Sequence, residues 1–204
     1  MSTLSAPLEE ARENLRVIRQ TMERSTKYST LSGLSGVLIG LTAIIGVAVT
    51  RVIIGARQAG IAQAQLIQMA TVWAIVLAAA VAIEFLANKR RARQVGKHVV
   101  SPLGAHIILA ALPGFVAAAV LTAFFVAHGL LFSVWGVWML SYGLAICAVG
   151  LFSVKPVSIL GGAFVLAGAV TLLLPPSAQL PMMALTFGGF HIVYGILMAR
   201  KHGW

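Results

Sequence analysis

Long apolar stretches alternate with short polar connections along the chain after residue 30. Each stretch is close to the roughly 20 residues that an α-helix needs to cross the hydrocarbon core of a bilayer. Their approximate bounds are 31–50, 66–87, 105–127, 130–152, 157–174 and 181–199. The pattern therefore predicts an all-α, polytopic membrane protein with a helical bundle of six transmembrane helices, forming one domain over residues 31–204.

Glycine and proline mark the breaks in this pattern. His128-Gly129 is all that separates the third stretch from the fourth, and together the two would form a helix of roughly 70 Å, too long for one ~30 Å crossing. A tight turn is therefore expected at Gly129. Pro113 predicts a kink in the third helix, and Pro175-Pro176 ends the fifth.

Residues 1–30 follow a different pattern and are predicted to form a cytoplasmic segment with an amphipathic helix over 8–22. Apolar residues recur there at spacings of three and four, and charged residues fill most other positions; the apolar ones are Leu8, Ala11, Leu15, Ile18 and Met22. This stripe suits the inner membrane surface or the protein's own loops. It equally suits a protein partner or self-association with a second copy.

Composition excludes an ordinary soluble protein. Hydrophobic residues make up 59% of the chain and charged residues 10%, against about 25% charged in soluble domains. The net charge of +10 comes from basic residues at the ends of apolar stretches. That placement indicates membrane topology and the lipid bilayer, with its anionic headgroups, as the partner of these charges, and no nucleic acid.

The densest basic run sets the orientation. It consists of Lys89, Arg90, Arg91, Arg93 and Lys97. Of the 15 Lys and Arg residues, 13 lie on one predicted side of the membrane: five in the amino-terminal segment, five in this connection between spans 2 and 3, one between spans 4 and 5, and two at the carboxyl terminus. The connections on the other side, which follow spans 1, 3 and 5, hold the remaining two. The imbalance predicts that both termini lie in the cytoplasm. Trp135 and Trp138 then fall near the outer interface, and Trp204 near the inner one.

Small residues at helical spacing predict the faces through which helices pack. They are Gly36 and Gly40 in the first span, Ala74, Ala78 and Ala82 in the second, and Gly161, Gly162 and Gly168 in the fifth.

Few polar residues lie inside the spans, and because each is costly in hydrocarbon they are the candidate functional residues. The candidates are Glu84, His106, His191 and Tyr194, all expected in the inner leaflet. Glu84 either pairs with Lys89 or Arg90 or serves as an intramembrane site. His106 suits the interface, and His191 suits either an interhelix hydrogen bond or a ligand or proton role. Tyr142 is interpreted as a packing residue.

Motifs for catalysis or cofactors are missing from the sequence. It contains no Walker motif, G-x-S-x-G or H-E-x-x-H, so nucleotide hydrolysis, serine hydrolysis and zinc proteolysis lack their minimum parts. Neither a zinc ligand set nor a second histidine at the depth of His191 for haem is present, and Cys147 stands alone. The sequence thus predicts no metal and no cofactor, and favours a protein that is not an enzyme.

Both ends of the chain carry a resemblance. Residues 13–28, ENLRVIRQTMERSTKY, and 190–195, FHIVYG, followed by 200–203, RKHG, resemble a family of small six-span bacterial inner-membrane proteins with no established activity. The resemblance implies the fold and the location, and it assigns no role to any residue.

Two functions fit these features. The first is a non-enzymatic membrane subunit, anchor or sensor that acts through its cytoplasmic face and the 8–22 helix. The second is a small transporter, or the substrate-binding membrane subunit of one, that uses the sparse polar residues of the inner leaflet. The sequence identifies no small-molecule ligand.

Overall fold

A computed structural model describes residues 9, 13–15, 33–55, 61–94 and 102–202. The described elements are helical: α2 (Gly33–Ile54), α3 (Gln63–Gln94), α4 (Pro102–Ala127), α5 (Ser133–Gly150), α6 (Lys155–Leu173), α7 (Pro176–Met183), the π-helix η1 (Ala184–Phe190) and α8 (His191–His202). Within these residues six helices are long and apolar enough to cross a membrane, which confirms the predicted class. Most of the predicted 8–22 helix lies outside the described residues, as does Trp204.

The sixth crossing differs from the prediction. It was expected to begin near Pro181, but the helix begins at Pro176 and Pro181 lies inside α7. Proline has a backbone suited to the first helical turn, so Pro176 starts a helix where the sequence suggested only a stop. The crossing runs through α7, η1 and α8 without a break, and its middle part is a π-helix. π-helices are rare in proteins, and those that occur are frequently found at functional sites.

The turns follow the glycines. Gly129 has a φ of +71° and connects α4 to α5, as predicted for the tight turn. Gly55 has a φ of +66° directly after α2. Positive φ values are costly for residues with a Cβ, so glycine at these two positions lets the chain reverse in a few residues.

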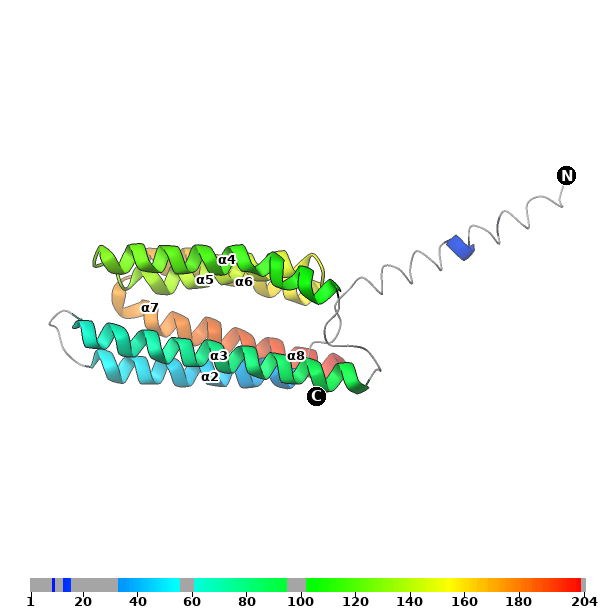
Figure 1. Ribbon diagram of the computed structural model, residues 1–204, viewed down its shortest axis with the longest axis horizontal. Helices are drawn as coiled ribbons and strands as arrows, with labels where there is room; N and C mark the ends of the chain where they lie inside the picture. Colours follow the sequence, from blue (N-terminus) through cyan, green and yellow to red (C-terminus); the bar gives the residue numbers. More distant parts are fainter. Residues whose placement is uncertain (1–8, 10–12, 16–32, 56–60, 95–101, 203–204) are drawn as a thin grey trace.

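The helices form two layers of three (Figure 1). In the first layer α2 lies between α3 and the α7–η1–α8 crossing, and in the second α5 lies between α4 and α6. The helices alternate in direction, so Arg90, Arg93, Lys155 and Arg200 share one end of the bundle, called the basic end below. Arg51 and His128 lie at the opposite end.

Within each layer the helices touch through glycines. A Cβ added at Gly143 of α5 would lie 2.6 Å from the Val165 amide nitrogen, and one at Gly168 of α6 would lie 2.6 Å from the Leu140 amide nitrogen. In the first layer, a Cβ at Gly40 would lie 2.6 Å from the Gly188 carbonyl oxygen. Backbones this close leave no room for a side chain, so α5 packs on α6, and α2 on η1, backbone against backbone. Between α2 and α3 the glycine meets a side chain instead, since a Cβ at Gly46 would lie 2.8 Å from the Val76 side chain.

The contact between the layers is made by large side chains. It is called the seam here, and its buried residues are Met69, Trp135, Met139, Phe164 and Met183; Trp73, Tyr142 and Phe187 pack against them. Across the seam the rings of Trp73 and Trp135 lie 5.8 Å apart, and those of Phe164 and Phe187 lie 5.0 Å apart. The seam therefore joins the layers by side-chain packing.

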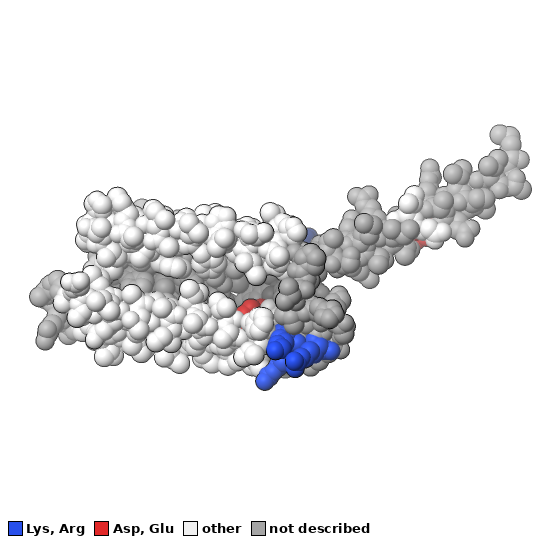
Figure 2. All heavy atoms as spheres, in the orientation of Figure 1, with Lys and Arg blue, Asp and Glu red and all other residues white. Residues whose placement is uncertain are grey.

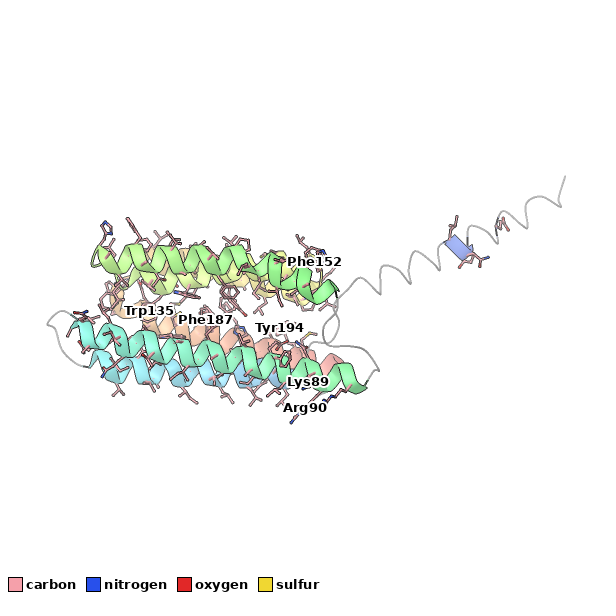
Figure 3. All side chains as sticks on the ribbon, in the orientation of Figure 1. Lys89, Arg90, Trp135, Phe152, Phe187 and Tyr194 are labelled. Atoms are coloured by element: carbon pink, nitrogen blue, oxygen red, sulfur yellow. The ribbon has the colours of Figure 1, made fainter. Side chains whose placement is uncertain are left out.

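The side chain of Trp135 is buried, although the sequence predicts that this residue falls near the outer interface. It lies close to the start of α5, but its side chain is 5% exposed and points into the seam (Figure 3). Trp138 is half-buried and donates a hydrogen bond to the Thr122 hydroxyl at 2.9 Å. Depth along a helix does not determine which way a side chain faces, and here Trp135 faces the neighbouring layer.

Candidate functional site

A polar contact crosses the seam near the middle of α5. The Tyr142 hydroxyl on α5 lies 2.7 Å from Nε2 of His191, the first residue of α8. His191 is 5% exposed, so its ring nitrogens must find partners inside the protein. This hydrogen bond ties the two layers together where η1 meets α8.

The π-helix fixes the proton on the histidine ring. The His191 amide donates to the Gly188 carbonyl, and Nδ1 lies 2.9 Å from the Phe187 carbonyl oxygen. A carbonyl only accepts hydrogen bonds, so Nδ1 carries hydrogen. In the neutral ring Nε2 is then the acceptor, and the Tyr142 hydroxyl donates to it. A proton added at Nε2 would reverse the direction of this bond, because Nε2–H would donate to the tyrosine oxygen.

Aromatic rings surround the pair. The Tyr142 ring lies 4.8 Å from Phe164 and 5.0 Å from Phe187, and the His191 ring lies 5.4 Å from Phe164. Phe115 of α4 approaches Tyr142 edge-on at 6.3 Å. These rings exclude water and strengthen the hydrogen bond between the two polar side chains.

Further polar groups lie toward the basic end. Glu84 and Asn88 are one turn apart on α3, and the Asn88 amide donates to the Glu84 carboxylate at 3.1 Å. Tyr194 follows His191 by one turn on α8, and the Glu84 carboxylate lies within electrostatic range of both Tyr142 and Tyr194. Figure 3 shows Trp135, Phe187 and Tyr194 in this order along the bundle, with Tyr194 nearest the basic end.

Two of these groups have buried atoms without partners. They are the Tyr194 hydroxyl and Asn88 Oδ1. A buried polar atom without a hydrogen bond costs roughly 1–3 kcal/mol, so such atoms mark places where a ligand or water would bind. Together with the Glu84 carboxylate they offer mainly acceptor oxygens, which suit a ligand or water that donates hydrogen bonds.

The predicted polar residues are only partly brought together. Glu84 and Tyr194 lie between His191, whose hydrogen bond crosses the seam, and the basic end. His106 lies exposed near the start of α4. Tyr142 was interpreted as a packing residue, and the structure adds a hydrogen bond to that role. This pairing could have been found from the sequence, because Tyr142 lies near the middle of its span, at about the same depth as His191 in another span.

The remaining predicted residues have varied surroundings. A Cβ at Gly36 would lie 2.9 Å from the Gly195 Cα, and one at Gly161 would lie 2.7 Å from the Cys147 amide nitrogen. Gly162 faces open space. The three alanines expected to form a packing ridge, Ala74, Ala78 and Ala82, are exposed.

The basic run is described in part. Lys89 is half-buried, Arg90 and Arg93 are exposed, and Figure 2 shows blue side chains gathered at the basic end, close to acidic atoms between the layers. Of Arg91 only the helical backbone is described, and Lys97 lies outside the described residues. Across those described residues, histidine, cysteine and acidic side chains form no group of three that could hold a metal ion.

No protein-family model, curated protein or solved structure matches this chain.

Proposed function

We propose that this protein is a small membrane transporter, or the substrate-binding membrane subunit of one, in which the two layers move against each other. The observation that carries the proposal is the difference between the glycine contacts within each layer and the side-chain seam between them. Many transporters work by the rocking of one rigid group of helices against another. Side chains in a seam repack more easily than backbones in contact, so motion would occur at the seam.

The polar residues between the layers would form the substrate-binding site of such a transporter. The Tyr142–His191 bond holds the layers together near mid-membrane, and Glu84, Asn88 and Tyr194 lie between it and the basic end. A solute that donates hydrogen bonds would reach Glu84 and Tyr194 from the basic end. The Trp135–Met139 part of the seam would block its way to the opposite end. Breaking the Tyr142–His191 bond would let the layers separate there.

We infer that the basic end faces the cytoplasm, with both chain termini on that side of a bacterial inner membrane. The support is the alternating helix direction, which collects Arg90, Arg93, Lys155 and Arg200 at one end. Basic residues are retained on the cytoplasmic side during insertion. The polar site then opens toward the cytoplasm in this conformation.

Transport would be tested in proteoliposomes that contain a pH-sensitive dye and carry the purified protein. The low-molecular-weight fraction of an extract of the source cells is added outside, and uptake is measured by mass spectrometry of the vesicle contents, with the dye reporting coupled proton movement. We expect selective accumulation of at least one solute by the wild-type protein. Glu84→Gln and His191→Ala should reduce that accumulation at least tenfold.

Thr122→Val is the matched control, because it removes an interhelix hydrogen bond within the second layer, that of Trp138 to Thr122. Its uptake should equal that of the wild type. The proposal is wrong if wild-type vesicles accumulate nothing beyond empty vesicles. It is also wrong if Glu84→Gln and His191→Ala leave accumulation unchanged.

A role as a partner-binding subunit, anchor or sensor through the 8–22 helix remains a separate hypothesis. Its support is the apolar stripe in the sequence, of which the structure describes the helical residues Glu9 and 13–15, with Leu15 65% exposed. Purification from the native membrane in mild detergent tests it. A stoichiometric protein partner that is lost when Leu15 and Ile18 are changed to Asp would support this role.

A further inference from the structure

A shallow groove of about 530 Å³, open over most of its surface, lies on the exposed face of α3. Its walls are apolar, and its lining residues are Ala74, Leu77, Ala78, Val81, Ala82 and Phe85. Leu77, Val81 and Phe85 are 44%, 61% and 52% exposed, so large side chains border a floor of alanines. The small residues that looked like a helix-packing ridge in the sequence therefore form a hollow on the surface that lipid would cover.

Basic side chains continue the same helical face. Ala78, Ala82, Phe85 and Lys89 follow one another at spacings of four, three and four, and Arg93 comes four residues after Lys89. Residues at these spacings share one face of an α-helix. The groove therefore has two cations at one end, the half-buried Lys89 and the exposed Arg93.

The length of the groove fits one leaflet. From Ala74 to Phe85 the helix rises about 16 Å, close to half of the ~30 Å hydrocarbon core. Lys89, one turn beyond Phe85, is then at the level of the phosphate headgroups. An apolar surface that is one leaflet long and ends in basic residues matches a phospholipid in length and in charge.

From this geometry we propose that α3 carries a binding site for one anionic phospholipid. An acyl chain lies along Ala74, Ala78 and Ala82, and the phosphate contacts Lys89 and Arg93. Figure 2 shows the Lys and Arg side chains together at the basic end, where they are available to a headgroup. This site is separate from the polar site at Tyr142–His191 and does not depend on transport.

Charge favours the lipid over a second copy of α3 in the groove. Two parallel copies packed through the alanine ridge would bring Lys89 and Arg93 of one copy next to the same residues of the other. Like charges at a contact are unfavourable, whereas an anionic phosphate neutralises them. We therefore propose a phospholipid with a negatively charged headgroup as the occupant of this groove.

Native mass spectrometry of the full chain would test the site. The protein is released from nanodiscs that contain equal amounts of phosphatidylglycerol and phosphatidylcholine with the same acyl chains, and retained lipids are counted by mass. We expect one retained phosphatidylglycerol and a clear preference over phosphatidylcholine. Each basic residue contributes roughly fivefold to the binding of an anionic lipid, so Lys89→Gln with Arg93→Gln should reduce the preference roughly 25-fold.

Two matched controls separate the site from general surface effects. Arg51→Gln with Arg200→Gln removes the same charge elsewhere, and it should leave the preference unchanged. Ala78→Trp fills the floor of the groove and should abolish retention, whereas Val120→Trp, at an exposed position of α4, should not.

The proposal is overturned if Lys89→Gln with Arg93→Gln retains the wild-type preference, or if the Arg51 and Arg200 changes reduce it equally. It is also overturned if the wild-type protein is released as a dimer without lipid and Ala78→Trp makes it monomeric. That result would assign the groove to a second copy of α3.

Discussion

The contacts within the layers and the contacts between them are built from different residues. Within the second layer, glycines at spacings of seven, Gly136 and Gly143 on α5 and Gly161 and Gly168 on α6, bring the two backbones together. Between the layers, methionine and aromatic side chains fill the space. Apolar burial gives little net gain in a membrane, so close backbone contact stabilises the layers more than the seam stabilises their association.

The difference also separates rigid from adaptable parts. A glycine contact has one close geometry, and any displacement loses it, whereas methionine side chains can repack when their neighbours move. Met69, Met139 and Met183 all lie in the seam. We therefore expect the layers to behave as rigid bodies and any motion to occur at the seam between them.

The largest expected effect comes from breaking a contact within a layer. A Cβ at Gly161 would lie 2.7 Å from the Cys147 amide nitrogen, so Gly161→Leu should lower the free energy of unfolding by about 3 kcal/mol or prevent folding. Gly162→Leu is the control, since nothing lies within 4 Å of its Cβ position, and it should change stability by less than about 1 kcal/mol. SDS-induced unfolding in micelles measures both. Equal effects of the two changes would refute backbone-level packing.

A smaller effect is expected across the seam. Tyr142→Phe removes the 2.7 Å hydrogen bond and leaves Nε2 of His191 without its partner. Hydrogen bonds between membrane helices contribute on average about 0.6 and at most about 1.7 kcal/mol, and burial of His191 places this one toward the upper end. A double-mutant cycle with His191→Phe would measure the coupling energy. A coupling indistinguishable from zero would remove the bond from the account.

The smallest effect is expected at Trp135. Its Nε1 is buried without a hydrogen-bond partner, so Trp135→Phe removes an unpaired donor. This gain offsets the packing that the smaller ring loses in the seam, and the free energy of unfolding should change by less than about 0.5 kcal/mol in total. Trp138→Phe loses the hydrogen bond to Thr122 and should cost about 0.6 kcal/mol. Thermal unfolding of both variants in the same detergent compares them. A larger loss for Trp135→Phe would mean that the gain from removing the unpaired donor is absent, or that packing at Trp135 contributes more than expected.

Apolar patterning predicted the spans, because hydrophobic length is set by the bilayer and not by tertiary contacts. The turn at Gly129 could be predicted for the same reason, since one helix could not cover both spans. The lengthening of α3 to Gln94 was missed, because long basic side chains stay solvated while their backbone remains helical.

Tertiary pairing could not be predicted in the same way. Alanines at spacing four in α3 look like the glycines of α2 in sequence, but Ala78 is exposed and Gly40 is packed against Gly188. The π-helix left no clear signal either, although Gly188-Gly189 lies inside it. The Tyr142–His191 bond depends on which layers face each other, which apolar patterning does not determine.

The most direct test of the two-layer account is a distance measurement between spin labels. The labels are introduced in a Cys147→Ala background, at positions that are all exposed. One pair joins Leu86 of α3 to Leu197 of α8 in the same layer. The other pair joins Leu86 to Ile159 of α6 in the other layer. The account predicts one narrow distance within the layer that Tyr142→Phe leaves unchanged. Between the layers it predicts a broader distribution that Tyr142→Phe shifts to longer distances. A distribution between the layers that is equally narrow and unshifted would contradict the account.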